Sequence, residues 1–183
     1  VVGHVEWVKF LAVDQIPKAG LISHANKFIE APAGGAALIA VAMRNLINHP
    51  VHLFTALGKD QEGEKSFELL EQFGLKLHVA WREEPTRQGL SFVDSNGERA
   101  ITVIGNRLHP KASDLLPWEE LSSFDGVFIT AGDSQSVILS RKANFLAATP
   151  RIGLDIINAA SIKLDLLVGS GLDPDEKINL EEL

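Results

Sequence analysis

Short apolar runs alternate with helix-like segments along most of this chain, and this alternation limits the folds open to it. The runs expected to form strands are residues 1–5, 51–56, 75–79, 126–131, 145–148 and 164–168. The segments expected to form helices are residues 34–48, 61–73, 134–144, 150–161 and 174–183. Strands that alternate with helices in this way form a mostly parallel sheet. Because the runs are short and apolar, helices are expected on both faces of that sheet.

Two segments interrupt the alternation. Residues 8–31 hold a second extended stretch after a turn. Residues 88–104 read as two strands joined by Asp94-Ser95-Asn96-Gly97, which favours a β-hairpin. Their partial alternation of apolar and polar residues is typical of a small sheet with one wet face. We therefore expect a small β-sheet appendage, built from insertions at about 8–31 and 86–105.

The composition excludes several classes of function. A net charge of −7 disfavours binding to nucleic acids or to anionic membrane surfaces. The absence of Cys excludes disulfides, thiolate zinc sites and cysteine nucleophiles. The lack of Cys also makes a reducing cytoplasm the expected location. No apolar run approaches the roughly 20 residues of a transmembrane helix, so we expect no membrane span. The length suits one α/β domain over residues 1–183. Because the chain begins with Val1, which already lies in an expected strand, we expect residues to be missing at the N-terminus.

Residues 32–47 join a Pro-Ala-Gly-Gly turn to an alanine-rich amphipathic helix. Glycine pairs let the backbone approach a ligand closely, and a helix N-terminus offers unpaired N–H groups with a partial positive charge. Gly34 and Gly35 are therefore candidates to hold a hydroxylated or phosphorylated small molecule. A tight turn before a core helix is the alternative and stays equally open. The helix residues expected to face the core are Ala37, Leu38, Val41 and Ile47.

Two loops that follow expected strands offer further candidates. Asp60 lies in a Gly-x-Asp-x-x-Gly loop, where it is either part of a ligand site or, as its position favours, the N-cap of the next helix. Thr130 and Asp133 are suited to bind a polyol or to orient a metal-bound water. Asp133 or Ser134 is equally suited to cap the helix that follows, and both interpretations stay open.

Other motifs are incomplete. Gly169 and Gly171 supply two thirds of a dinucleotide-binding fingerprint, but Pro174 replaces the third glycine, which disfavours a Rossmann oxidoreductase. The six histidines have neither HxH nor HExxH spacing, so the sequence predicts no histidine metal site. No Gly-x-Ser-x-Gly elbow is present, and acyl transfer therefore has no nucleophile.

Seven short motifs follow one another in a recognisable order. They are Val2-Gly3-His4, Val13-Asp14-Gln15-Ile16-Pro17-Lys18-Ala19-Gly20, Pro32-Ala33-Gly34-Gly35-Ala36-Ala37, Gly58-Lys59-Asp60-Gln61-Glu62-Gly63, Pro85-Thr86-Arg87, Asp94-Ser95-Asn96-Gly97-Glu98-Arg99 and Thr130-Ala131-Gly132-Asp133. Together they span nearly the whole chain, and the chain resembles the N-terminal part of ribokinase-like (PfkB family) carbohydrate kinases. The resemblance implies a three-layer α/β/α ribokinase-like (Rossmann-like) body with a small β-sheet lid, whose C-terminal part is missing.

The resemblance also implies a function. The expected reaction transfers the γ-phosphoryl group of ATP to a sugar or sugar-like alcohol, with Mg²⁺. By position, Gly34 and Gly35 are expected to touch the substrate and to form the lid hinge. Glu6 and Asp133 are expected near the substrate hydroxyls. Because the exposed lid face commonly mediates dimerisation in this family, a homodimer is also expected.

The chain departs from the family at positions that bear on function. Ser170 and Asp173 form a shortened version of the Asn-x-x-Glu motif that organises Mg²⁺ and phosphates. Val8 and Ile39 stand where the family often has an acidic residue and an Asn that bind substrate, which argues against ribose and leaves the acceptor open. The Gly-Ala-Gly-Asp segment, which supplies the anion hole and the catalytic Asp, is missing. We therefore expect no catalytic residue here and a truncated chain that is inactive alone. A non-catalytic binding or assembly module is the alternative.

Overall fold

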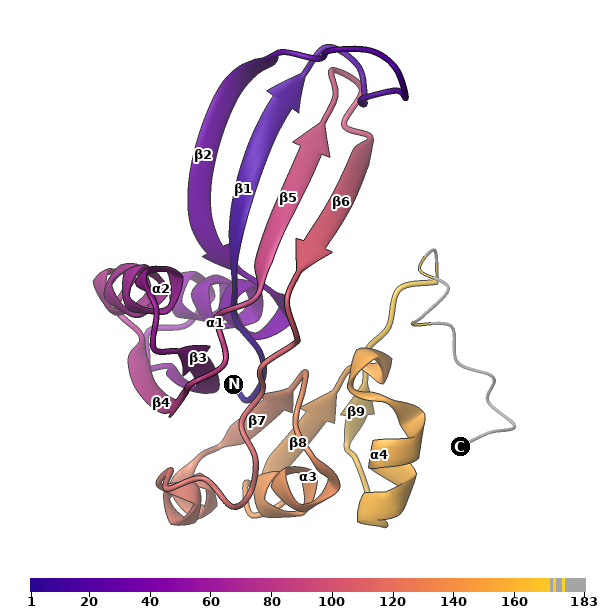
Figure 1. Cartoon of the computed structure of the whole chain (residues 1–183). Helices are drawn as coiled ribbons and strands as arrows, with labels where there is room; N and C mark the ends of the chain where they lie inside the picture. The colour runs from indigo at the N-terminus through magenta and orange to yellow at the C-terminus, as the bar shows by residue number, and fades with distance from the viewer. Residues whose placement is uncertain (172, 174–175, 177–183) are drawn as a thin grey trace.

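The first residues of the chain join two halves of a parallel sheet. The computed structural model of the chain describes residues 1–171, 173 and 176 (Figure 1). Val2 forms parallel bridges with Phe54 on one side and Ile129 on the other. Its N–H donates to the carbonyl of Phe128 at 2.9 Å, and the N–H of Gly3 donates to the carbonyl of Phe54 at 3.0 Å. The strand expected over residues 1–5 is therefore reduced to one bridged position.

The remaining strands of this sheet flank Val2. On one side, β3 (His52–Gly58) pairs in parallel with β4 (Lys76–Arg82). On the other side, β7 (Gly126–Ile129), β8 (Phe145–Ala148) and β9 (Leu166–Leu167) also pair in parallel. The order across the described part of the sheet is β4-β3-Val2-β7-β8-β9, with parallel pairing at each step. This is the sheet that the alternation of strands and helices predicts.

Helices cover both faces of the parallel sheet. They are α1 (Gly35–Leu46), α2 (Gln61–Gln72), α3 (Ser134–Ser140) and α4 (Leu154–Ala160), with the 3₁₀ turns η1 (Trp118–Ser123) and η2 (Pro150–Ile152). Successive side chains of β3 point to opposite faces. Leu53 and Leu57 share a core with α1 and α2. Phe54 shares the opposite core with Trp118 of η1 and Val137 of α3, and the predicted three-layer α/β/α body is confirmed.

The inward face of α1 differs from the prediction. Its buried residues are Ala36, Ala37 and Ala40. Leu38 and Ile47, which were expected to face the core, are 61% and 45% exposed. The small alanine side chains let the helix lie close to the sheet, and Leu38 points away because it is about 100° further round the helix than Ala37.

The expected helices near the C-terminus are shorter than predicted. α3 ends at Ser140, before the expected boundary at residue 144. The helix expected over 150–161 is divided at Gly153 into η2 and α4. The helix expected over 174–183 lies, apart from residue 176, outside the described residues. Within the described part of the chain, no helix combines the length and the apolar character that a membrane span requires.

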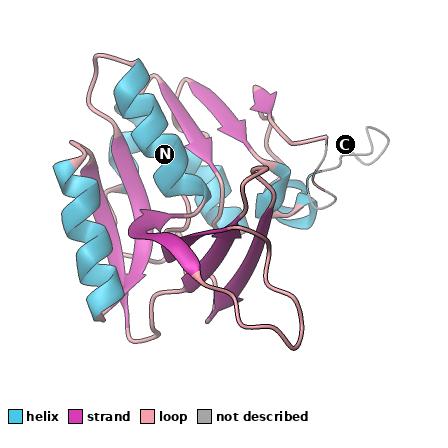
Figure 2. Cartoon of the chain, turned by 90° about the horizontal axis from the view of Figure 1, so that it is seen from above, coloured by secondary structure: helices cyan, strands magenta, loops and turns pink. Residues whose placement is uncertain are grey.

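A second sheet of four strands stands over the body, as Figures 1 and 2 show from two directions. Its order is β2-β1-β5-β6. β1 (Glu6–Val13) pairs with β2 (Ala25–Ala33) antiparallel and with β5 (Gln88–Val93) in parallel. β6 (Arg99–Ile104) pairs with β5 antiparallel. The two segments that interrupt the alternation thus fold together, and we call this sheet the lid.

The hairpin predicted at residues 94–97 joins β5 to β6. The carboxylate of Asp94 accepts hydrogen bonds from the main-chain N–H groups of Asn96 and Glu98, at 2.9 and 3.0 Å. Gly97 has φ +83°, a conformation that glycine adopts without a steric penalty. The hairpin is therefore confirmed together with the residues that predicted it.

Candidate functional site

A cavity of about 1050 Å³ lies between the lid and the carboxyl ends of the parallel strands. Lid residues that line it are Glu6, Val8, Phe10, Ser91, Ile101 and Val103. The start of α1 contributes Gly34, Gly35, Leu38 and Ile39. The carboxyl edge of the sheet contributes His4, Thr130, Thr149, Arg151 and Val168. Ligands of open α/β sheets bind at this edge, so the cavity is the candidate site.

Gly34 marks the point where the chain leaves the lid and enters α1. Its φ of +87° and ψ of 161° fall in a region open essentially to glycine alone. A Cβ atom there would lie 3.0 Å from Nε2 of His4 and 3.1 Å from its carbonyl oxygen. Gly35 has more room, since its Cβ would lie 3.4 Å from Cβ of Thr130. The glycine pair therefore lines the cavity with main-chain atoms at the root of the lid.

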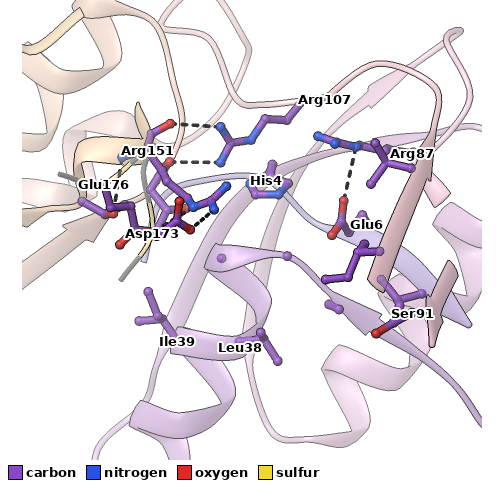
Figure 3. A pocket seen from close by; sticks show the side chains of 18 of the residues that line it. His4, Glu6, Leu38, Ile39, Arg87, Ser91, Arg107, Arg151, Asp173 and Glu176 are labelled. Carbon is purple, nitrogen blue, oxygen red and sulfur yellow. Dashed lines mark hydrogen bonds and ion pairs between the residues drawn. The ribbon is translucent and has the colours of Figure 1, made fainter. Parts of the chain in front are cut away.

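Glu6 and Arg87 form an ion pair at the base of the lid. Glu6 opens β1 and Arg87 immediately precedes β5, and the parallel register of these strands brings the two side chains together. Nε of Arg87 lies 3.4 Å from Oε2 of Glu6 (Figure 3). This is an ion-pair distance without hydrogen-bond alignment, since the same Nε makes no hydrogen bond to another described residue. The lid carboxylate expected near the substrate is thus present and partly neutralised.

His4 lies beneath Gly34 and is buried. Burial, reinforced by the nearby guanidinium groups of Arg107 and Arg87, lowers its pKa to about 3. His4 is therefore neutral at pH 7. Its Nδ1 atom is buried without a hydrogen bond to another described residue, as is Oγ1 of Thr130 beside it in the cavity wall. Two polar atoms in this wall are therefore buried without a hydrogen-bond partner among the described residues.

Arg107 extends into the cavity from the segment that follows β6. Its guanidinium donates to the carbonyl of Arg151 at 3.1 Å and makes a longer contact of 3.5 Å with the carbonyl of Thr130. Burial, together with repulsion from Arg87 and Arg151, lowers the pKa of Arg107, while Glu6 opposes this effect. Among the described residues, no carboxylate forms an ion pair with Arg107.

The segment after β9 brings acidic groups to the other side of the cavity. Arg151 forms ion pairs with Asp173 and with Glu176, the latter at 2.7 Å between Nε and Oε1 (Figure 3). Ser170 donates its main-chain N–H to Oε2 of Glu176 at 2.7 Å. Hydrogen bonding to Asp173, although opposed by burial, raises the pKa of Arg151. The predicted phosphate and metal region, Ser170 and Asp173, therefore lines the cavity, with its carboxylate bound to a guanidinium.

The sequence that forms the lid, the glycine turn and most of the sheet edge matches a known protein family. A family model described as pfkB family carbohydrate kinase matches residues 1–149. This chain belongs to the pfkB family. A search of curated proteins gave no match.

Solved structures share the fold of this pfkB-family chain. Ribokinase from Giardia lamblia superposes with a TM-score of 0.67 and 17% identity, over 80% of this chain and 49% of the ribokinase. Ribokinase from Thermotoga maritima superposes with a TM-score of 0.66 and 21% identity, over 91% of this chain and 57% of the ribokinase. Ribokinase from Arabidopsis thaliana, complexed with ribose and ATP, superposes with a TM-score of 0.63 and 19% identity, over 91% of this chain and 57% of the ribokinase. The chain thus spans about half the length of these proteins, and at these identities the likeness concerns the fold.

Asp133 lies outside this cavity wall, although the motif placed it near the substrate. Its Oδ1 atom accepts from the main-chain N–H of Ser136 at 2.7 Å and caps α3. Its Oδ2 atom is 3.3 Å from the main-chain N of Ala112, which donates to it. The capping interpretation of Asp133 is therefore confirmed. Contact between this carboxylate and a substrate stays a prediction that the cavity lining does not support.

Asp60 also proves to be a cap, as its position favoured. Its Oδ1 atom accepts from the N–H of Gly63 at 2.8 Å, at the start of α2. The same carboxylate accepts from the N–H and the hydroxyl of Thr86, at 2.6 and 2.8 Å. Because Thr86 directly precedes Arg87 and β5, the cap of α2 also fixes the root of the lid.

The basic residues of the cavity were missed by sequence reasoning. His4 and Arg87 belong to two of the seven motifs but had no assigned role, while Arg107 and Arg151 belong to none of them. A usable signal exists for Arg151, because it follows a strand that ends at the carboxyl edge of the sheet. For Arg107 there is none, since its role depends on how the lid lies over the body.

Proposed function

We propose that the protein containing this chain transfers the γ-phosphoryl group of ATP to an alcohol group of a carbohydrate-like acceptor. The carrying observation is the cavity that the lid and the Gly34-Gly35 turn enclose over the carboxyl edge of the sheet, in a chain of the pfkB family. The Arabidopsis ribokinase complexed with ribose and ATP superposes on 91% of this chain, which supports the same use of the fold. We also propose that the protein is located in the cytoplasm.

The described residues would bind and orient the reactants. The main chain at residues 34–35 leaves room for close approach, and the first N–H groups of α1 direct partial positive charge at the cavity. Phosphoryl transfer depends on positioning and on neutralising negative charge, which Arg107 is placed to do.

Mg²⁺ is expected with ATP, but the carboxylates near the predicted metal region form ion pairs with an arginine. Asp173 and Glu176 both pair with Arg151, so an ion would have to compete with a guanidinium. The residues present do not fit the ion, and we derive no step through it. The sequence also lacks the Gly-Ala-Gly-Asp segment that supplies the catalytic Asp in this family. We therefore propose that the 183-residue chain alone does not turn over ATP and acceptor.

The acceptor would carry a negative charge. Neutral polyols are bound by carboxylates and amides, but the family positions for such groups hold the apolar Val8 and Ile39, which line the cavity. Arg87, Arg99, Arg107 and Arg151 also line it. Glu6 pairs with Arg87, and Asp173 and Glu176 pair with Arg151, which leaves the charges of Arg107 and of the exposed Arg99 to a ligand. Guanidinium groups suit carboxylates and phosphates, so sugar acids and sugar phosphates are the favoured classes.

A substrate screen on the complete protein tests this function. ATP-dependent phosphorylation would be measured against matched pairs of neutral and anionic polyols. We expect product with at least one acceptor and a preference for the anionic member of each pair. Absence of product from every acceptor, with retained ligand binding, would instead favour a non-catalytic module. A preference for neutral acceptors would overturn the acceptor class and leave the kinase proposal intact.

A homodimer through the lid is part of the same proposal. Large apolar side chains that do not line the cavity are exposed on this sheet, namely Phe28, Ile29 and Ile104, at 55–64%. Burial of such side chains against a second copy would stabilise a dimer. Light scattering over a range of concentrations tests it, and a monomer throughout would contradict it.

A further inference from the structure

Two histidines meet on a part of the sheet that takes no part in the cavity. His52 opens β3, and His78 lies in β4. The parallel register places Phe54 opposite His78, so His52 and His78 are diagonal neighbours on the same face of the sheet. Phe54 packs into the core below η1, and Glu120 of that turn completes the group. These three side chains therefore come from three elements that are separate in the sequence.

The distances in this group are close to those of a metal site. Nδ1 of His52 lies 2.9 Å from Nε2 of His78. One ligand atom from each of His52, His78 and Glu120 lies within 4.8 Å of the other two. Nitrogen ligands about 2.0–2.1 Å from a tetrahedral zinc ion lie about 3.3 Å apart. The imidazoles would have to separate by a few tenths of an ångström and turn so that both nitrogen lone pairs point at the ion, and the exposed Glu120 would turn toward it.

Aromatic neighbours hold both imidazole rings in place. His78 stacks on Phe54 with the ring centroids 4.3 Å apart, and His52 packs against Phe124 at 4.7 Å. Phe54 is fully buried, so the ring of His78 rests on a fixed part of the core. Ligands that are already ordered lose less conformational entropy when an ion binds.

The charge state of the rings suits a cation. Burial lowers the pKa of His52, and His78 and Lys76 lower it further, while Glu120 opposes this. Burial also lowers the pKa of His78, and there Glu120 again opposes the shift. The neutral imidazole is the form that binds a metal. Glu120 adds the negative charge that a divalent ion requires.

We propose that His52, His78 and Glu120 form a binding site for a divalent transition-metal ion of the zinc class. The ion would replace the hydrogen bond between the imidazoles, and the proton on the shared nitrogen would move to the other nitrogen of the same ring. Water would fill the remaining coordination position. The bound ion would tie η1 to β3 and β4. This site is independent of the proposed kinase function, because none of its residues lines the cavity.

Titration of the metal-free protein with Zn²⁺ tests the proposal, with calorimetry for stoichiometry and thermal unfolding for stability. We expect one saturable Zn²⁺ per chain and a rise in the unfolding temperature with Zn²⁺. His52→Gln and His78→Gln should each weaken binding at least tenfold, and Glu120→Gln several-fold. His24→Gln is the matched control, because His24 is exposed and lies in the irregular segment before β2.

Two outcomes would overturn the site. The first is the absence of saturable binding, which would leave the histidine pair as a hydrogen bond alone. The second is equal binding by the His24→Gln and His52→Gln proteins, which would place Zn²⁺ elsewhere. Because Glu120 is exposed, Glu120→Gln keeps the fold even where a histidine variant does not. Unchanged affinity in that variant would remove Glu120 from the site.

Discussion

Thr86 donates both its main-chain N–H and its hydroxyl to the carboxylate of Asp60, at 2.6 and 2.8 Å. The hydroxyl of Thr86 in turn accepts from the N–H of Gly58 at 2.9 Å. One buried network therefore links the end of β3, the start of α2 and the root of β5. Since Arg87 is the next residue, the position of a cavity guanidinium depends on a helix cap that lies outside the cavity.

Removal of this cap should destabilise the protein. Asp60→Ala deletes an N-cap, which costs about 1 kcal/mol, and leaves the buried polar groups of Thr86 without partners, which costs about 1–3 kcal/mol more. We expect the free energy of unfolding to fall by about 2–4 kcal/mol in denaturant titrations. Glu64→Ala, an exposed substitution in the first turn of the same helix, should change it by less than about 0.5 kcal/mol. Equal losses of unfolding free energy in the two variants would show that the Asp60–Thr86 network does not contribute to stability.

The glycine turn offers a second matched pair of substitutions. Gly34→Ala places a Cβ atom at φ +87° and 3.0 Å from Nε2 of His4. Conformations of this kind cost about 1–3 kcal/mol for other residues. Gly35→Ala meets only ordinary contacts of 3.4 Å or more with Thr130 and adds a better helix former. We expect chemical denaturation to show that Gly34→Ala lowers the free energy of unfolding by about 2–3 kcal/mol and that Gly35→Ala changes it little. A larger loss for Gly35→Ala would contradict the backbone geometry of the turn.

His4 should make stability depend on pH. Its pKa is lowered to about 3 when folded and is about 6.5 when unfolded, so the unfolded chain binds the extra proton between these values. The contribution is fully present above about pH 6.5 and is lost at roughly 1.4 kcal/mol per pH unit as the pH falls toward about 3. Denaturation between pH 7 and pH 5 should show this slope.

His4→Gln is the comparison that isolates this residue, because His52, His78 and His109 also have lowered pKa values. The variant should have a shallower dependence on pH in the same range. Parallel curves for the two proteins would mean that His4 is not neutral in the folded state.

Local patterns in the sequence predicted most of the fold and two of its caps. Alternating strands and helices, the hairpin at residues 94–97 and the cap at Asp60 each depend on neighbours in the chain. The sequence did not predict the contact between His52 and His78, because it depends on the register of two strands. It also favoured Leu38 over Ala40 on the inner face of α1, since hydrophobicity alone does not report how closely a helix approaches a sheet.

The site was less predictable for the same reason. Gly34, Gly35 and Glu6 line the cavity. The local turn-to-helix pattern singled out the glycine pair, whereas Glu6 was assigned by the family resemblance, and contact of these residues with a substrate stays a prediction. Asp133 was assigned by its motif, but the requirement to cap α3 takes its carboxylate out of the cavity wall. The position of Arg107 follows from the lid as a whole, and no single segment determines it.

Arg107 gives the sharpest test of what fills the cavity. In the complete protein, Arg107→Gln should lower kcat/KM for an anionic acceptor by about 10–100-fold, since hydrogen bonds to charged groups contribute about 1.5–3 kcal/mol. The change should appear in the acceptor KM, with the ATP KM nearly constant, and Arg107→Lys should restore part of it. Arg44→Gln, in α1 and outside the cavity, serves as the control. A rise in the ATP KM alone would assign the guanidinium to the donor phosphates, and unchanged kinetics would exclude it from binding either reactant.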